Sequence, residues 1–129
     1  MLGHPQGLSY STRHLWVRIE RAEHTATVGI TEELVEQLGE ILSVDMPMVG
    51  DELDMESFCI HLHLANRIHH LRSPLTGRVL EINREVLDSA GLLHISPYEN
   101  WLYRMEFDDV EELHLLMSPE QYTRFLDNL

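Results

Sequence analysis

Short alternating segments, each bounded by turn residues, recur along this chain and constrain its fold more than any other feature. Residues 14–19, HLWVRI, place Leu15, Val17 and Ile19 on one face of an extended strand, because strand side chains alternate between faces. Further strands are predicted at residues 25–30, 41–46, 57–64, 68–72, 78–82 and 101–107. Many short strands joined by turns indicate a mainly β domain, a small sandwich or barrel.

Two helices are predicted from the residues at their ends. Thr31 is a typical N-cap residue, and Gly39 stands where a helix beginning at Thr31 would end. The segment 118–121, Ser-Pro-Glu-Gln, is typical of a capping box with proline at the first helical position. We expect this C-terminal helix to bury Tyr122, Phe125 and Leu129.

The length of 129 residues predicts one domain. Residues 1–12 are polar and carry Gly3, Pro5 and Gly7, so they are expected to form a flexible N-terminal tail ahead of a domain at 13–129. No apolar run approaches the ~20 residues needed to cross a bilayer, and the first residues do not resemble a signal peptide. We therefore expect a cytoplasmic protein without a membrane partner.

The formal net charge of -13 argues against nucleic acid as a partner, because so acidic a chain repels phosphate backbones. The same charge would suit docking into a basic groove of a protein, or would serve solubility alone. Cys59 is the single cysteine, and it lies within the apolar alternation of a predicted strand. A buried, inert thiol is therefore expected there.

The chain contains no lysine at all. Its nine basic residues are Arg13, Arg18, Arg21, Arg67, Arg72, Arg78, Arg84, Arg104 and Arg124. Chemistry that requires a lysine ε-amine, such as a Schiff base or a lipoyl or biotinyl amide, is therefore excluded.

A six-residue pattern occurs twice, at residues 39–44 and 77–82, as glycine, a charge, a β-branched residue, leucine, a polar residue and a β-branched residue. This repeat suggests a barrel made of two similar halves.

Six motifs in order resemble the H-protein of the glycine cleavage system. They include His14-Leu15-Trp16-Val17, which is similar to the family's His-Glu-Trp-Val, and residues 73–79, which are similar to its Ser-Pro-Val-Ser-Gly-Glu-Val. The others lie at residues 26–31, 38–41, 46–51 and 96–102. The resemblance covers roughly residues 13–128 and implies a barrel-sandwich hybrid, the hammerhead fold of lipoyl and biotinyl domains, with short helices.

The resemblance also implies where a swinging arm would be attached. The family carries lipoic acid on the lysine of a Glu-Ser-Val-Lys-Ala motif at a hairpin tip. A gapless count back from Ser73 places that lysine at Asn66 and the glutamate at His63. The Asn66 carboxamide is not a nucleophilic amine, and Arg67 stays protonated. We therefore expect no covalent lipoyl cofactor.

Histidines surround this tip, at positions 61, 63, 69 and 70. A turn at Asn66-Arg67 would pair His63 with His70 and gather His61, His63 and His70 on one face of the hairpin. Imidazoles are common ligands of zinc and other divalent transition metals, so these three are candidate metal ligands. An exposed polar hairpin that simply titrates, or a pH-sensitive docking tip, would use the same residues.

Two functions follow from these observations. The first is a non-catalytic, H-protein-like module that binds glycine decarboxylase, aminomethyltransferase or a lipoate-attaching enzyme as a scaffold, decoy or regulator. The second is a metal-binding protein that uses His61, His63 and His70. An independent enzyme is not expected, because in the family the partners carry out catalysis and fold likeness alone gives no chemistry.

Overall fold

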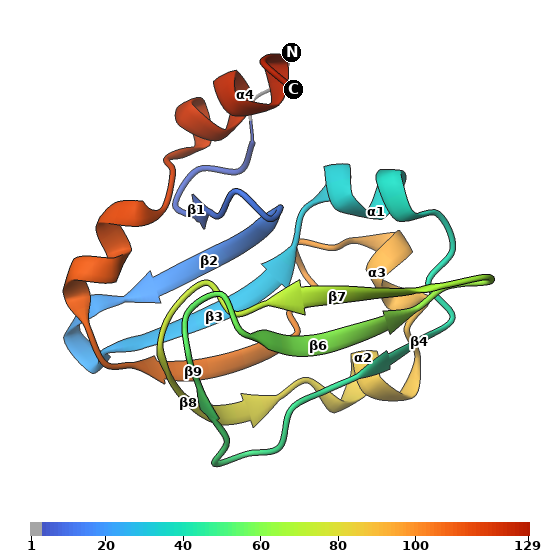
Figure 1. The fold of residues 1–129 in the computed structure, drawn as a ribbon, viewed down its shortest axis with the longest axis horizontal. Helices are drawn as coiled ribbons and strands as arrows, with labels where there is room; N and C mark the ends of the chain where they lie inside the picture. Colours follow the sequence, from blue (N-terminus) through green and yellow to red (C-terminus); the bar gives the residue numbers. More distant parts are fainter. Residues whose placement is uncertain (1–3) are drawn as a thin grey trace.

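The structure is a computed structural model that describes residues 4–129 (Figure 1). Its strands are β1 (Ser9–Tyr10), β2 (Leu15–Glu20), β3 (Thr25–Ile30), β4 (Ser43–Asp45), β5 (Glu52–Leu53), β6 (Phe58–His63), β7 (Ile68–Arg72), β8 (Gly77–Ile82) and β9 (Tyr103–Phe107). Its α-helices are α1 (Glu32–Leu38), α2 (Arg84–Asp88), α3 (Leu92–Ile95) and α4 (Pro119–Asp127), and 3-10 turns occur at Arg21–Glu23 and Val110–Leu115.

The strands form two antiparallel sheets. The larger sheet has the order β1-β2-β3-β9-β8-β5, and the smaller has the order β4-β6-β7. In Figure 1 the green hairpin of β6 and β7 lies in front of β3 and β9, and its tip projects at the right-hand edge. The prediction of a mainly β fold with short helices is therefore confirmed.

The main core fills the space between these two sheets. Val28 and Met105 of the larger sheet and Ile60 and Leu62 of the smaller belong to one apolar cluster, and all four are fully buried. Burial of apolar surface contributes about 25 cal/mol per Å², so this layer is the main source of stability. It also fixes the direction in which the β6–β7 hairpin projects.

Both predicted helices are confirmed, with the caps expected. The hydroxyl of Thr31 accepts a hydrogen bond from Leu34 N at 3.3 Å, and Gly39 ends α1 with a positive φ of 76°. At α4, Ser118 and Gln121 form a reciprocal capping box, with Pro119 at the start of the helix. These signals are local in sequence, which is why they predict the boundaries well.

Residues 4–12 of the predicted N-terminal tail make contacts with distant parts of the chain, and residues 1–3 lie outside the described part. His4 Nε2 lies 2.6 Å from Glu33 Oε2, and the ring of Tyr10 stacks on Tyr122 with centroids 4.8 Å apart. The backbones of Tyr10 and Met117 are also hydrogen-bonded to each other. Residues 4–12 therefore pack against the C-terminal region. These long-range contacts exist only once α4 is placed, so the composition of this segment did not reveal them.

The C-terminal helix buries Tyr122 completely, as predicted, and Phe125 partly. Leu129 is 78% exposed, so the expectation that it would be buried is wrong. The physical reason is that α4 ends at Asp127, and Leu129 lies beyond the last residue that packs against β1.

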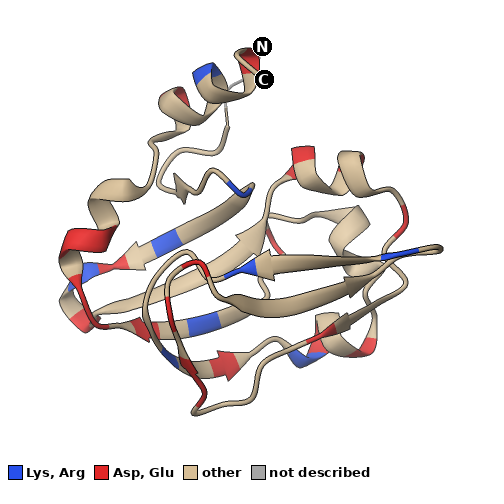
Figure 2. Ribbon diagram, viewed as in Figure 1, with Lys and Arg blue, Asp and Glu red and all other residues tan. Residues whose placement is uncertain are grey.

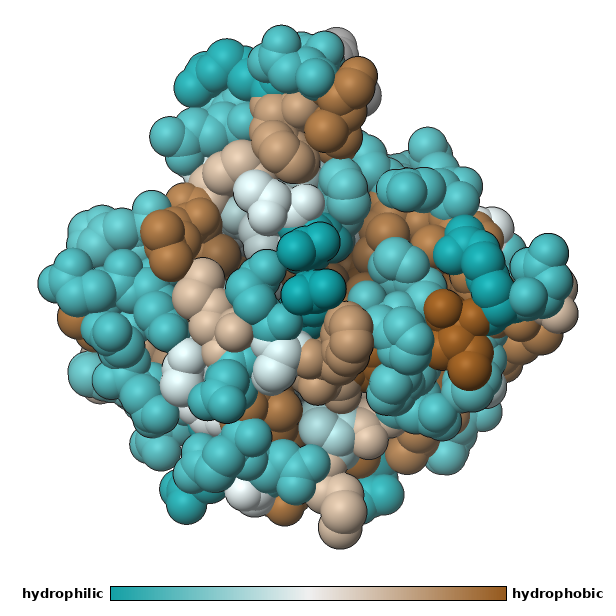
Figure 3. All heavy atoms as spheres, viewed as in Figure 1, coloured by the Kyte–Doolittle hydropathy of each residue, from teal (hydrophilic) through white to brown (hydrophobic). Residues whose placement is uncertain are grey.

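The surface is polar on the face drawn in Figure 3, where apolar side chains appear as separate patches. Acidic segments are spread over several helices and loops (Figure 2). Among residues 4–129, no helix reaches the length and apolarity that crossing a membrane requires.

Gly77 permits a close approach between β8 and β9, which gives a test of the fold. A Cβ at Gly77 would lie 2.0 Å from the Glu106 carbonyl oxygen, so Gly77→Ala is expected to destabilise the protein by about 1–3 kcal/mol. At Gly91 a Cβ meets nothing within 4 Å and φ is -60°, so Gly91→Ala is expected to be neutral or to stabilise by up to about 1 kcal/mol. Urea denaturation of both variants measures the difference, and equal stabilities would contradict the close approach.

Candidate functional site

The candidate site begins at the tip of the β6–β7 hairpin, where the sequence placed Asn66. Leu64 N donates to Arg67 O at 2.9 Å and closes a two-residue loop of Ala65 and Asn66. Leu64 is buried beneath the loop, whereas Ala65, Asn66 and Arg67 are exposed. Residue 66 therefore stands exposed at the tip of the hairpin, carrying a carboxamide where an amide-linked arm would need a primary amine. The residues present do not fit a lipoyl group.

The register of the hairpin differs from the predicted one. The loop lies one residue earlier than the expected turn at Asn66-Arg67, so His61 pairs with His70 and His63 pairs with Ile68. The predicted pairing of His63 with His70 is therefore wrong. A shift of one residue in the turn moves the pairing of β6 with β7 by two residues. Each side chain therefore stays on the face that was predicted for it. His61, His63 and His70 still share one face of the sheet, and His69 lies on the other.

On that face the histidines form two separate pairs. His61 Nδ1 lies 2.6 Å from His70 Nδ1, so one ring must donate a hydrogen to the other. His63 Nε2 lies 2.7 Å from Asp45 Oδ2 of β4, the neighbouring strand. Within the described residues, no three His, Cys, Asp or Glu side chains are arranged to hold a metal ion. The structure thus brings His61 and His70 together and draws His63 toward a carboxylate.

Asp45 is a residue that the sequence analysis missed. It pairs directly with His61 across β4 and β6, so it belongs to the same row as His61 and His70. A signal for it was present, since Asp45 lies within the strand predicted at residues 41–46, but the partner of that strand could not be known from the sequence.

His69 lies on the opposite face of the hairpin and lines the same hollow as His14. Burial lowers the pKa of His69 below 6.5, and Arg67, His70 and His14 lower it further. Burial also lowers the pKa of His14, although Glu33 opposes this shift. The His14 ring is held by Tyr122, whose hydroxyl lies 2.8 Å from Nδ1. Both imidazoles are therefore neutral at neutral pH.

These two rings line a hollow of about 200 Å³ between the turn before β2, helix α1 and the end of β7. We call it the Arg13–Arg72 hollow, after the two arginines among its lining residues. Its lining residues are Thr12, Arg13, His14, Leu34, Gln37, His69, His70, Leu71 and Arg72. Sequence reasoning missed it because it joins three segments that lie far apart in the chain.

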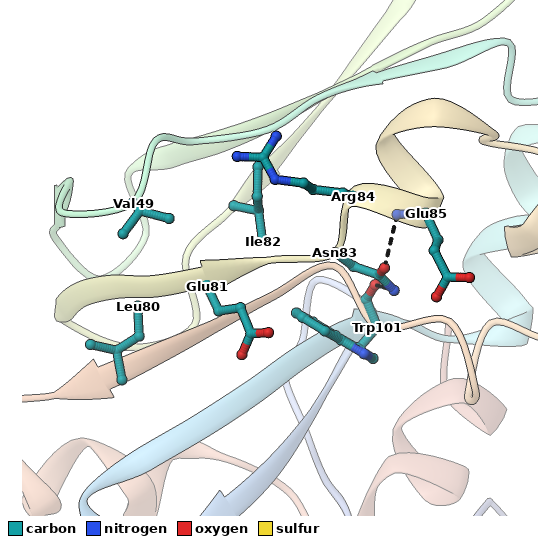
Figure 4. A pocket seen from close by; sticks show the side chains of 8 residues that line it. All are labelled: Val49, Leu80, Glu81, Ile82, Asn83, Arg84, Glu85 and Trp101. Atoms are coloured by element: carbon teal, nitrogen blue, oxygen red, sulfur yellow. Dashed lines mark hydrogen bonds between the residues drawn. The ribbon is translucent and has the colours of Figure 1, made fainter.

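A second hollow, of about 400 Å³, lies along β8 and the start of α2 (Figure 4). Ile82 and Arg84 point to one side of this segment, and Asn83 points to the other. Asn83 Oδ1 accepts from Glu85 N at 3.2 Å, and Asn83 Nδ2 donates to Trp101 O at 2.8 Å. Its amide caps α2, so it serves the fold.

Cys59 is half-buried, where the sequence predicts a buried residue, and its thiol is inert as expected. Burial raises the pKa of its thiol to about 11, and Sγ lies 3.6 Å from the Tyr103 hydroxyl. The thiol is protonated at neutral pH and is a poor nucleophile.

Comparison with known proteins relates the whole chain to one family. A sequence model of the glycine cleavage H-protein family matches residues 8–129. The glycine cleavage system H protein of Staphylococcus saprophyticus is 37% identical over 123 residues, covering 95% of this chain and 96% of that protein. The corresponding protein of Aeromonas hydrophila is 36% identical over 124 residues, covering 95% of each.

The fold is similar to that of a solved structure. The crystal structure of a glycine cleavage system H protein from Mycobacterium marinum matches with a TM-score of 0.85 and 27% identity, covering 98% of this chain and 100% of that one. The expected barrel-sandwich hybrid fold is thereby confirmed.

Burial of His69 predicts a specific acid sensitivity. In the unfolded chain His69 takes up its proton near pH 6.5, whereas the folded protein resists protonation until a lower pH. The free energy of unfolding therefore falls as the pH drops from 6.5 toward the lowered pKa. His69→Gln should reduce the loss of stability between about pH 7 and about pH 5 in urea denaturation. His114→Gln, at an exposed histidine, is the control, and equal losses in both variants would contradict the assignment.

Proposed function

The chain belongs to the glycine cleavage H-protein family, and on that basis we propose that it is a cytoplasmic, non-catalytic docking module that carries no lipoyl arm. It would bind glycine decarboxylase, aminomethyltransferase or a lipoate-attaching enzyme and act as a scaffold, decoy or regulator. Its relatives are named as components of the glycine cleavage system. We propose that this chain binds the same kind of enzyme but does not carry a lipoyl group.

One observation carries this proposal: Asn66 occupies the exposed hairpin tip of a chain that has no lysine. Attachment of lipoic acid requires a primary amine that can be acylated. The Asn66 carboxamide and the permanently protonated Arg67 guanidinium do not meet that requirement.

The preserved frame supports the docking half of the proposal. The tip is closed by the bond from Leu64 N to Arg67 O, so the hairpin has a defined shape without an arm. A family surface presented by the same fold would still fit an enzyme that reads shape and charge. The net charge of -13 favours a basic face on that enzyme.

The proposal predicts competition. The purified chain should displace a lipoylated H-protein from aminomethyltransferase or glycine decarboxylase. The displacement should slow the turnover of that enzyme, because turnover requires the lipoyl arm of the displaced protein. Because charge contributes to docking, competition should weaken between about 50 mM and about 300 mM salt. Surface plasmon resonance with the immobilised enzyme measures the displacement.

The variant Asn66→Lys is the matched control. It places an amine at the tip and leaves the frame unchanged, so it should compete as strongly as the unaltered chain. Intact-mass measurement after incubation with a lipoate-attaching enzyme should show no addition to the unaltered chain. A lipoyl mass on the unaltered chain, or absence of binding to all three enzymes, would remove the proposal.

We also propose a second candidate function, metal binding, which rests on the His61–His70 contact. Two ring nitrogens 2.6 Å apart are close to the spacing of two ligands on one ion. A tetrahedral zinc ion with Zn–N bonds of about 2.0 Å would hold them roughly 3.3 Å apart, so a small rotation of the rings would admit the ion. His63 would complete the set by releasing Asp45, and Asp45 itself is an alternative ligand.

Zinc titration followed by NMR of the histidine rings tests this second function. Zinc should shift the resonances of His61, His63 and His70 together, and His61→Gln should weaken binding by about tenfold or more. His114→Gln is the control, since that side chain is exposed and lies outside the hairpin. Ring resonances of His61 and His70 that do not move would exclude the metal site.

A further inference from the structure

We propose that a groove between helix α2 and the connection from β4 to β5 binds a basic amphipathic helix of a partner protein. The groove consists of the hollow of about 400 Å³ along β8 and an adjoining hollow of about 490 Å³, which share Val49, Ile82 and Arg84 as lining residues. We call it the Met48–Arg84 groove, after two residues that line it. It uses neither Asn66 nor the hairpin tip, so it does not depend on the function proposed above.

Hydrogen bonds fix both walls of the Met48–Arg84 groove. On one side Met48 N donates to Asp51 Oδ2 at 2.9 Å, and Gly50 N donates to Val79 O of β8 at 2.8 Å. On the other side the amide of Asn83 caps α2. A partner therefore meets a groove that is already formed, and less conformational entropy is lost when it binds.

The groove has an apolar and partly exposed lining. The apolar residues of the larger hollow are Met46, Pro47, Met48, Val49, Ile82 and Leu87. Met46 and Ile82 are half-buried against the main core, whereas Met48 is 72% exposed and Val49 is 59% exposed. Exposed apolar side chains gathered around a concavity mark an interaction site. Methionine side chains are flexible and polarizable, so they can adapt to the side chains of a partner.

The shape of the groove favours a helix as the occupant. In Figure 4 Ile82 and Arg84 point toward the segment that carries Val49, and these three residues border both hollows. An amphipathic helix presents apolar side chains three and four residues apart on one face. Two such side chains can enter the two hollows together.

The charges of the lining select a basic partner. The acidic lining residues are Asp45, Glu81 and Glu85, and Arg84 is the one basic residue among them. Glu85 is exposed and takes part in none of the salt bridges found among residues 4–129. In Figure 2 acidic segments lie on α2 and on the adjoining strand β4. Lysine or arginine beside the apolar anchors would meet these carboxylates, whereas an acidic helix would be repelled.

The net charge of the chain also argues against a second copy as the occupant. Each copy carries a formal charge of -13, so two copies repel each other, whereas a basic helix is attracted. Sedimentation of the full chain should therefore show a monomer. Self-association that Val49→Gln abolishes would assign the groove to a second copy and refute the proposal.

The test is a fluorescence anisotropy titration of a short labelled helix of leucine and lysine with the full chain at low salt. Binding should saturate at one peptide per chain, and the methyl resonances of Met46 and Met48 should shift along the same curve in NMR. A helix of leucine and glutamate should not bind, and the leucine–lysine peptide interrupted by proline should bind much more weakly. Absence of saturable binding, or equal affinities for these three peptides, would overturn the proposal.

Val49→Gln tests the apolar contact without changing the charge of the chain. It should weaken binding of the leucine–lysine helix by about tenfold, because it places a polar group among the anchors. Leu115→Gln is the matched control, since Leu115 is 63% exposed and lies outside the groove, and it should leave the affinity unchanged. Equal losses in the two variants would mean that the peptide does not bind in the groove.

Glu85→Gln tests the charged rim. It should weaken binding by about threefold at low salt and by less at high salt, because a rim charge contributes little and is screened. Glu111→Gln removes an equally exposed carboxylate outside the groove and should have a smaller effect. Equal effects of the two variants would show attraction by the net charge alone and would refute the site. All four variants alter exposed side chains, so thermal unfolding should confirm that each keeps its fold.

Discussion

The apolar layer between the two sheets is the interaction on which the other features depend. It joins residues such as Val28 and Met105 to Ile60 and Leu62, which belong to strands far apart in the sequence. Because β6 contributes both to this layer and to the hairpin, the buried residues of β6 fix the face on which His61 and His63 appear. The core thereby decides the chemistry of the exposed tip, and Asn66 stands at the end of a rigid support.

Much of the fold could be predicted because its signals are local. Thr31, Gly39 and the capping box at Ser118 each act within a few residues, and the alternation of residues 25–30 gives the bounds of β3. The predicted register of the β6–β7 hairpin was wrong because the segment from Leu64 to Arg67 contains no Asn-Gly or similar turn signal. Nothing in the sequence therefore favoured a turn at Ala65-Asn66 over a turn at Asn66-Arg67. The predicted faces of the histidines were nevertheless correct, because a register shift of two residues leaves every side chain on the same face of the strand.

The residues around the Arg13–Arg72 hollow show what a single sequence leaves out. Arg13, Leu34 and Arg72 are ordinary surface or core residues when each is considered alone, and they become a set only where the turn before β2, helix α1 and strand β7 come together. Asn66, in contrast, is identified from the sequence alone, by the alignment of the motifs and by the absence of lysine. Family resemblance finds the loss of an old site more readily than the presence of a new one.

The stacking of Tyr10 on Tyr122 also has a consequence for the order in which the protein is made. Tyr122 holds His14, and β1 packs against α4, so the first and last segments of the chain complete each other (Figure 1). During synthesis the N-terminal residues emerge first but must wait for the final helix to leave the ribosome. In a nascent or C-terminally clipped chain that lacks α4, Tyr10 would lose its stacking partner, and the Arg13–Arg72 hollow would lack the contact that orients His14.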